Sequence, residues 1–452
     1  MRYETPVLGP PWSIPFELPV FEAIVAVISQ VGHVPLDQAG RFASIAFFYA
    51  TCWPLFILLR QIGIGRLSAL VTLALFTISP HYIFWSHTFM IESTALFFAT
   101  AYLASVVVAI NRGTVARRPA WLFVLLSAGL GSLAGTIKVT TYVPFLLAAG
   151  LWILYEAWRC LINPGSPGRA ALLSFFAIAV PFFLTLLWTY FADSLKAQNP
   201  MGNYLTSRNL RPWNFGAFQQ RFVLSNYAHF AGLGIGHVVD NIVGSRYLLL
   251  VALLVVIVVR GRLLLAFLVS MALYVSAFTI FFNLHYIHTY YEYANGIFAV
   301  AAIGIAIAAL LDSGGWKAWI GVVFFMLAIG ACVNHYFPEY YSLQHTNKPG
   351  RPAAATILDR DTKPTDIMMV YGLDWSSALP YQAHRRAVMA FKRIGDPPLD
   401  QEIAKLGAGN IAALVICADG RSNSAVLIEK WQALGFKASQ SYKADDCEIY
   451  ER

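Results

Sequence analysis

Residues 91–111, IESTALFFATAYLASVVVAIN, decide the fold class of this chain. The stretch carries a single charged side chain, Glu92, in 21 residues. A helix rises about 1.5 Å per residue, so a segment of this length matches a hydrocarbon layer about 30 Å thick. The sequence therefore predicts a transmembrane helix that begins with a carboxylate.

The same apolar character extends over most of the chain. Hydrophobic residues make up 58% of the 452 residues and charged residues only 12%, whereas about a quarter of a soluble protein is charged. Nine other segments are long and apolar enough to span a bilayer, or nearly so: 39–60, 67–86, 119–138, 139–158, 170–192, 246–260, 262–283, 291–311 and 316–337. We therefore predict a mainly α-helical, polytopic bundle of about ten transmembrane helices within residues 39–340.

Basic residues indicate which side each loop faces. Short loops rich in Lys and Arg face the cytoplasm, and ten spans place all five such loops on one side: 60–66, 112–118, 159–169, 260–262 and Lys317. This bias accounts for the formal net charge of +8, so membrane lipids are expected partners and nucleic acid is not. The opposite side then holds the large loop 193–245 and both termini. The topology predicts a multi-pass protein of the inner (plasma) membrane.

The C-terminal region has a different composition. Residues 345–452 hold 27 of the 56 charged residues. Short apolar runs at 367–372, 412–418 and 447–450 read as strands, and amphipathic helices alternate with them. We predict a small soluble α/β domain over 345–452, extracytoplasmic in this topology. Cys417 and Cys447 lie in its predicted strands, and an oxidising compartment permits a disulfide between them.

Residues 1–38 form a distinct outer segment, in which a Pro-rich loop precedes an interfacial helix. Five prolines among the first 19 residues block helix formation and keep the loop extended. Its carboxylates, Glu4 and Glu17, are either solvated or held rigidly toward a substrate. The topology leaves the N-terminus outside, so we expect a further transmembrane helix upstream of Met1.

Two isolated charges at the outer edge of the bundle are candidate functional groups. Glu92 opens an apolar helix, where a carboxylate is costly unless it meets a partner, water or substrate. It either caps the positive end of that helix or handles a proton. Lys138 is the only charged residue between Arg118 and Glu156. It either anchors the chain at the interface or binds phosphate.

The stretch NLHYIHTYYEYANG at 283–296 gathers polar groups at the same edge. An aromatic belt explains tyrosines such as Tyr290 and Tyr291, but it does not explain His285, His288 and an acid. The two histidines are three residues apart and have no third ligand in the sequence nearby, so no metal site is predicted. No cofactor is predicted either.

Together these stretches resemble the GT-C superfamily of membrane glycosyltransferases, in particular the protein O-mannosyltransferases and the lipid A aminoarabinose transferase. The resemblance covers residues 1–340 in order and spacing. It is carried by the Pro-rich loop running into Pro-Val-Phe, the Ala-Gly-Arg start of a span at 39–41, Glu92, a lone Lys138 after Gly-Thr-Ile, and His-x-x-His-x-Tyr-Tyr at 285–291.

The resemblance implies an inverting sugar transfer from a polyprenyl-phosphate-linked donor to a lipid, glycan or protein acceptor at the outer face of the membrane. The implied catalytic acids are Glu92, Glu17 and Glu4. The implied donor-phosphate ligands are Lys138, Arg41 and His288, and the implied substrate-binding residues are His285, Tyr290 and Tyr291. In the family the first outer loop follows a transmembrane helix and carries the first acid near its start. Here Glu17 stands where the family has a Lys/His-Pro-Pro-Leu motif.

Two alternative functions remain open from the sequence. An O-antigen ligase or polymerase would also use outer-loop arginines, and loop 193–245 supplies Arg208, Arg211 and Arg221. A secondary transporter is the alternative from a non-enzymatic class. Transporters commonly show internal repeats, and none is visible in this sequence.

Overall fold

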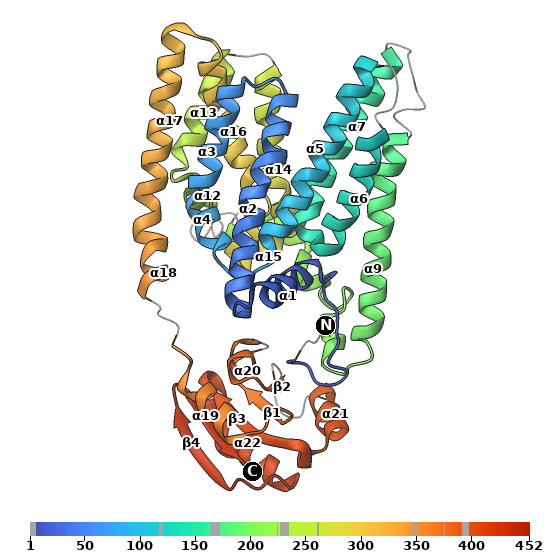
Figure 1. Cartoon of the computed structure of the whole chain (residues 1–452), viewed down its shortest axis with the longest axis vertical. Helices are drawn as coiled ribbons and strands as arrows, with labels where there is room; N and C mark the ends of the chain where they lie inside the picture. The colour runs from blue at the N-terminus through green and yellow to red at the C-terminus, as the bar shows by residue number, and fades with distance from the viewer. Residues whose placement is uncertain are drawn as a thin grey trace. The chain divides into compact units, whose positions relative to one another are not determined.

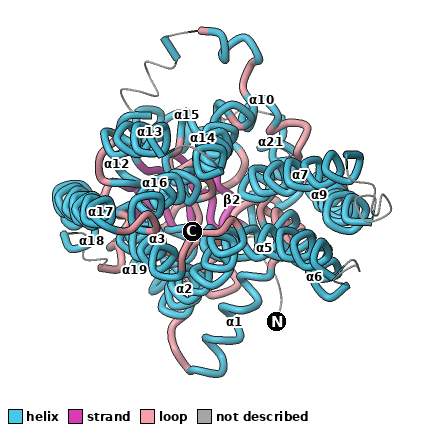
Figure 2. The backbone as a smooth tube through the Cα atoms, turned by 90° about the horizontal axis from the view of Figure 1, so that it is seen from above, coloured by secondary structure: helices cyan, strands magenta, loops and turns pink. Residues whose placement is uncertain are grey.

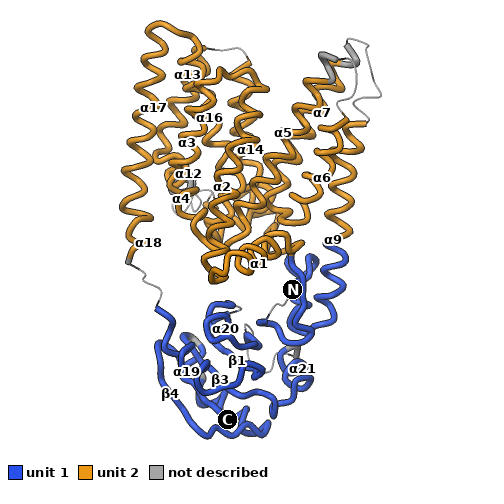
Figure 3. Tube along the Cα trace, viewed as in Figure 1, with its two compact units in different colours: residues 1–16, 189–210, 347–452 blue, residues 17–188, 211–346 orange. Residues whose placement is uncertain are grey.

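The computed structural model describes residues 6–116, 121–162, 172–223, 225–226, 235–259, 262–346, 350–374, 376–390 and 397–452. The chain divides into two compact units (Figure 3). The helical unit comprises Glu17–Trp188 and Arg211–Thr346. The other, which we call the C-terminal unit, is built from three separate stretches: Met1–Phe16, Thr189–Leu210 and Asn347–Arg452.

Helices lie at every segment for which a span is predicted (Figure 1). Those before the large outer loop are α1 (Val20–Gly32), α2 (Leu36–Gln61), α3 (Arg66–Ile78), α4 (Pro80–Ser86), α5 (Glu92–Ala116), α6 (Trp121–Ile137), α7 (Val139–Ile162), η1 (Ser174–Ala179) and α9 (Val180–Lys196). Those within and after the loop are η2 (Gly202–Leu205), α10 (Arg211–Phe215), η3 (Phe218–Phe222), α12 (Ile235–Val243), α13 (Tyr247–Val259), α14 (Arg262–Ile280), α15 (Phe282–Ile287), η4 (Thr289–Tyr293), α16 (Gly296–Leu311), α17 (Gly315–Tyr336), η5 (Phe337–Tyr341) and α18 (Ser342–Thr346).

Six of the described helices are long and apolar enough to cross a membrane, or seven if one bent pair counts as a single span. The six are α2, α5, α7, α14, the continuous run of η1 with α9, and the run Gly315–His345, which begins with α17 and continues through η5 into α18. The chain is therefore a mainly helical, multi-pass membrane protein, as predicted. The number ten stays a prediction, because α6, α13 and α16 are apolar but have only 17, 13 and 16 residues.

The bent pair is α3 and α4, predicted as one segment over 67–86. The two helices meet at an angle of 59°. Pro80 causes the break because its ring excludes the helical conformation from the residue before it, and Ser79 accordingly has φ −57° and ψ 124°. The short helix α4 then brings Tyr82 against the η4 turn, where its hydroxyl donates to the Tyr293 carbonyl at 2.9 Å.

Two helices form the centre of the helical unit. Helix α16 is buried along nearly its whole length and lies among α3, α12, α13, α14 and α17 (Figure 2). Gly304 permits its close approach to α3, because a Cβ at this position would lie 2.3 Å from side-chain atoms of Thr72. Helix α5 packs against α2, α6 and α7. Of the residues in its apolar stretch 83% are buried, whereas only 22% are buried in the apolar stretch that begins with α17. Glu92 therefore begins a helix that the surrounding helices hold in place.

The C-terminal unit contains one five-stranded sheet of order β2-β1-β3-β5-β4. Its strands are β1 (Ile367–Tyr371), β2 (Arg386–Ala390), β3 (Ile411–Cys417), β4 (Gln440–Ala444) and β5 (Cys447–Glu451). Strands β2, β1 and β3 are parallel to one another, and β5 is antiparallel to both of its neighbours, β3 and β4. Its other helices and turns are α19 (Ala353–Asp361), α20 (Ala378–Ala383), α21 (Pro397–Leu406), η6 (Ala408–Asn410), η7 (Ala418–Asn423) and α22 (Ser424–Ala433).

The strands β1, β3 and β5 match the three predicted apolar runs. Strands β2 and β4 were not predicted. Strand β4 is an edge strand in which four of five residues are at least partly exposed, so its sequence lacks the apolar signal of a buried strand. Cys417 and Cys447 are paired across β3 and β5 in a disulfide, with their Cα atoms 4.0 Å apart.

The N-terminal stretch of the C-terminal unit extends the β2 edge of the sheet. Ala387 donates its backbone N–H to the Pro6 carbonyl at 2.8 Å, and Met389 donates to the Val7 carbonyl at 2.9 Å. The Asn199 side-chain amide, from the middle stretch, donates to the carbonyls of Leu8, Gly9 and Pro10 at 2.9–3.1 Å. Residues 6–10 therefore fold with the C-terminal sheet, which the sequence did not indicate.

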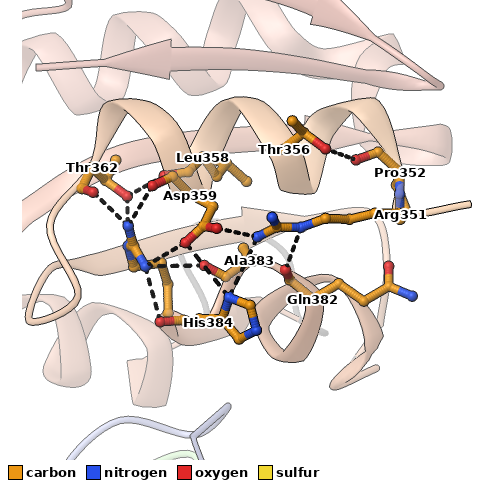
Figure 4. A network of polar contacts seen from close by, with 10 residues as sticks. Arg351, Pro352, Thr356, Leu358, Asp359, Thr362, Gln382, Ala383 and His384 are labelled. Carbon is orange, nitrogen blue, oxygen red and sulfur yellow. Dashed lines mark hydrogen bonds and ion pairs between the residues drawn. The ribbon is translucent and has the colours of Figure 1, made fainter. Parts of the chain in front are cut away.

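A network of polar contacts connects α19 to the stretch from α20 to β2, and it includes Asp359, Ala383 and His384 (Figure 4). Arg385 is 5% exposed, and all three of its guanidinium nitrogens donate hydrogen bonds. The acceptors are Thr362 Oγ1, Asp359 Oδ1 and the carbonyls of Asp359, Thr362, Ala383 and His384, at 2.5–3.1 Å. The hydrogen bond from Arg351 and the nearby charges of Arg351 and Arg385 hold the pKa of Asp359 below its usual range, so the carboxylate is charged at neutral pH.

Candidate active site

A buried ion pair between Glu92 and Lys138 forms the centre of the candidate site. Glu92 is the first residue of α5, and Lys138 occupies the turn between α6 and α7. The Lys138 ammonium donates a hydrogen bond to Glu92 Oε1, and the side chains are only 11% and 6% exposed. The second carboxylate oxygen, Oε2, is buried without a hydrogen-bond partner among the described residues. Pairing is what makes two such buried charges tolerable.

Two tyrosines of the η4 turn lie beside this pair. The Lys138 Nζ is 5.8 Å from the ring centre of Tyr290 and 5.0 Å from that of Tyr291, within the range of cation–π attraction. The two rings are stacked on each other with their centres 4.4 Å apart. The structure therefore joins three of the sequence-predicted stretches, although they are widely separated along the chain.

His288 and Glu17 complete the group around Lys138. The His288 ring lies 5.3 Å from Tyr290 and 6.2 Å from Tyr291. Partial burial lowers the pKa of His288, so at neutral pH it offers a hydrogen bond rather than a full charge. The backbone N–H of Leu18 donates to the Thr136 carbonyl at 2.9 Å, and the neighbouring Glu17 carboxylate is close enough to act electrostatically on Lys138.

The remaining predicted site residues lie elsewhere or outside the described residues. Arg41 pairs with Asp37 at 3.0 Å and donates to the His87 carbonyl at 2.9 Å, with half of its side chain exposed. His285 is buried beneath η4, with its Nδ1 3.2 Å from Glu292 Oε1. Glu4 lies outside the described residues.

Several residues that adjoin the site have no role predicted from the sequence. The Trp85 ring lies 5.7 Å from Tyr290, and the Ser93 and Tyr293 hydroxyls are 2.8 Å apart. Ser93 and Tyr293 lie within stretches already quoted, and Trp85 lies near the end of the predicted span 67–86, but only packing brings these residues to the site. No cluster of three or more His, Cys, Asp or Glu side chains within the described ranges is arranged to hold a metal ion.

The arrangement supplies the chemistry that a group transfer from a phosphate needs. Lys138 is a compact cation whose charge suits a phosphate. Glu92 has one oxygen on Lys138 and another that can accept a proton. Because the site is largely shielded from water, the interactions of these charges are stronger there than at an exposed surface.

Comparison with known proteins finds one matching family model and several similar solved structures. Residues 37–194 match the family model described as dolichyl-phosphate-mannose-protein mannosyltransferase. The fold is similar to that of ArnT from Cupriavidus metallidurans bound to undecaprenyl phosphate, with a TM-score of 0.59 and 14% identity over 96% of this chain and 87% of that one. The apo state of the same protein gives a TM-score of 0.53 and 15% identity over the same shares of the two chains.

Two further results complete the comparison. The arabinofuranosyltransferase AftD from Mycobacteria is similar with a TM-score of 0.48 and 15% identity, over 87% of this chain and 31% of AftD. No curated protein matches the sequence. The predicted resemblance to the GT-C membrane glycosyltransferases is confirmed, and the chain has an ArnT-like fold.

Proposed function

We propose that this chain is a membrane glycosyltransferase that moves a sugar from a polyprenyl-phosphate-linked donor to an acceptor at the outer face of the inner membrane. The observation that carries the proposal is the buried Glu92–Lys138 pair beside Tyr290 and Tyr291. Two comparisons support the donor class, since the matching family model is named for dolichyl-phosphate-mannose and ArnT was solved with undecaprenyl phosphate.

The proposed reaction exchanges the partner of Lys138. When the donor phosphate arrives, it replaces Glu92 as the anion facing the ammonium, and Glu92 becomes free to act as a base. The acceptor hydroxyl attacks the anomeric carbon as the bond from that carbon to the phosphate oxygen breaks. The hydroxyl proton goes to a carboxylate, and the polyprenyl phosphate leaves with its charge stabilised by Lys138. Direct attack inverts the anomeric centre.

The other predicted residues have secondary roles in this proposal. Glu17, and Glu4 from the same loop, are the candidate second acids that orient the acceptor. His288 is a candidate hydrogen-bond donor to the phosphate, and Arg41 is a candidate second cation for the phosphate. Tyr290 and Tyr291 offer aromatic faces for the sugar. The acceptor is a lipid, glycan or protein hydroxyl or amine.

Two structural features bear on the alternatives and on location. Arg221 donates to the backbone carbonyls of Phe215 and Ala217 in the loop and of Thr279 and Ile280 in α14. This arginine therefore fastens the loop to the end of α14, which lessens support for a ligase that uses it. The Cys417–Cys447 disulfide fits an oxidising compartment and supports an extracytoplasmic C-terminal unit.

Transfer from a radiolabelled polyprenyl-phosphate sugar in membranes tests the proposal. We expect Glu92→Gln to lower the rate about a hundredfold or more, because general acid–base catalysis contributes about that factor. Lys138→Ala should weaken use of the donor, and Lys138→Arg should not restore it, since a planar guanidinium differs in reach and geometry.

A matched control uses another buried carboxylate of the same unit. Glu156 is 3% exposed and pairs with Arg159 at 3.5 Å, near the other end of α7. Glu156→Gln should leave transfer within about twofold of the unmodified protein. Near-normal transfer by both Glu92→Gln and Lys138→Ala would refute the assignment of the site.

A further inference from the structure

The η4 turn directs some of its side chains toward the Lys138 site and others into the interior of the helical unit. Tyr290 and Tyr291 face the Lys138 ammonium. Glu292 and Tyr293, the next two residues, are both 0% exposed within the helical unit. The turn therefore places a buried carboxylate directly behind the aromatic residues of the candidate site, and the proposed reaction gives that carboxylate no role.

Tyr293 anchors the turn next to Glu92. Its hydroxyl is 2.8 Å from the hydroxyl of Ser93, the residue that follows Glu92 in α5. Its carbonyl accepts the Tyr82 hydroxyl of α4 at 2.9 Å. Contacts from α4 and α5 thus hold one end of the η4 turn next to the start of α5.

Glu292 is the other anchor. Its Oε1 lies 3.2 Å from Nδ1 of His285 in α15, within ion-pair distance although the two groups are not aligned as a hydrogen bond. The His285 side chain is 2% exposed, and its ring packs against Phe278 at 4.9 Å. Both groups are polar and surrounded by protein, where either one alone would be costly. The close contact between these two side chains therefore links η4 to α15.

Burial excludes Glu292 from contact with a substrate. A carboxylate with no exposed surface can affect the reaction only through the residues it holds, and those residues are Tyr290 and Tyr291 on the same short turn. The same burial argues that His285 supports the turn from behind and does not contact the sugar.

We infer that Glu292, paired with His285, is a positioning residue that holds Tyr290 and Tyr291 against Lys138 for binding of the lipid-phosphate donor. This inference rests on the proposed function. A displacement of about 1 Å in a catalytic group can cost about a hundredfold in rate. Loosening the turn should therefore impair donor use without removing any group that touches the donor.

The test is a double-mutant cycle in the full chain. Glu292→Gln should lower kcat/KM for the polyprenyl-phosphate sugar by about 10- to 100-fold. The same change should cost less than about twofold when Tyr290 and Tyr291 are both already alanine, because the groups it positions are gone. His285→Asn serves as a second variant should Glu292→Gln not accumulate, and Glu156→Gln is the matched control for loss of a buried carboxylate.

Two results would overturn the inference. One is an equal loss from Glu292→Gln in both backgrounds, which indicates a general structural role. The other is unchanged donor use by Glu292→Gln while Lys138→Ala is impaired, which leaves the proposed function intact. If the unmodified protein transfers no sugar, the proposed function fails. Binding of undecaprenyl phosphate to the purified protein then decides the inference, with about tenfold weaker binding expected for Glu292→Gln.

Discussion

The two units treat their buried charges differently. In the C-terminal unit, every guanidinium nitrogen of Arg385 donates to carbonyls, a hydroxyl or Asp359. In the helical unit, Lys138 meets Glu92, and Glu92 Oε2 has no hydrogen-bond partner among the described residues. A saturated charge is fixed as part of the scaffold. An ion pair in which one oxygen has no hydrogen-bond partner can exchange partners with a substrate. The proposed reaction requires such an exchange.

The largest expected effect in the C-terminal unit comes from removing Arg385, the buried charge whose nitrogens all donate hydrogen bonds. Arg385→Ala leaves several buried carbonyls without donors, and each such loss costs about 1–3 kcal/mol. We expect the free energy of unfolding of the C-terminal unit to fall by about 2–4 kcal/mol. Pulse proteolysis of the full-length protein in urea measures this change through the loss of protease-resistant C-terminal fragments.

Its control is an arginine that makes only surface contacts. Arg360 pairs with Asp361, and its side chain is 64% exposed, so Arg360→Ala should leave unfolding unchanged within error. Equal stability of the Arg385→Ala and Arg360→Ala variants would contradict the prediction. A buried charge whose donors are all hydrogen-bonded would then not indicate a structural role, and the contrast drawn between the two units would not hold.

Glu402 is a buried charge of the C-terminal unit that lacks such partners, and it offers a sharper test. Its carboxylate is buried against Gly9, and neither oxygen has a hydrogen-bond partner among the described residues. Burial raises the pKa of Glu402 to about 7, although the nearby Lys405 opposes the shift. The folded state therefore binds this proton more tightly than the unfolded state, whose carboxyl pKa is about 4.3.

The sign of the pH effect follows from that difference. The contribution of the protonated carboxyl to stability is complete below about pH 4.3 and is lost as the pH rises through about 7. The C-terminal unit should therefore be less stable at pH 8 than at pH 5.5, and Glu402→Gln should reduce that difference. Pulse proteolysis at the two pH values measures it. An identical pH dependence in the unmodified and Glu402→Gln proteins would contradict the prediction.

The smallest effect is expected at Arg41. This side chain is half exposed and already pairs with Asp37, and exposed pairs of this kind contribute about 0–1 kcal/mol. Arg41→Ala should lower transfer by less than about tenfold, well below the effect of Lys138→Ala, in the same membrane assay. A loss as large as that of Lys138→Ala would place Arg41 at the donor phosphate with Lys138.

The pairing of Glu92 with Lys138 shows how far the sequence leads toward the site. Each residue stands out because a charge in an apolar stretch needs a reason. Their contact joins residues 46 positions apart, and it depends on α5 and α6 packing side by side. The sequence identifies both members without indicating that they meet. For Arg41, the resemblance suggests the same role as for Lys138, binding of the donor phosphate. In the structure Arg41 contacts Asp37 and the His87 carbonyl instead.

The sequence likewise predicts part of the fold and leaves the rest to tertiary packing. Segment length and hydropathy fix the helices, because a bilayer admits only segments that satisfy their own backbone hydrogen bonds. They do not fix that Pro80 bends one predicted span into α3 and α4. The polar edge strand β4 escapes detection because its residues face solvent, and the attachment of residues 6–8 to β2 depends on backbone hydrogen bonds that carry no side-chain signal.

The sequence by itself determined that this chain is a multi-pass helical protein with polar groups at one edge of its bundle and a small C-terminal sheet. Those properties follow from local composition and periodicity. Only the tertiary structure decided that Glu92, Lys138, Tyr290 and Tyr291 form one site, that Glu292 and His285 lie behind it, and that the first residues of the chain join the last. These contacts depend on packing between distant segments, and the local sequence does not specify which distant partner each segment finds.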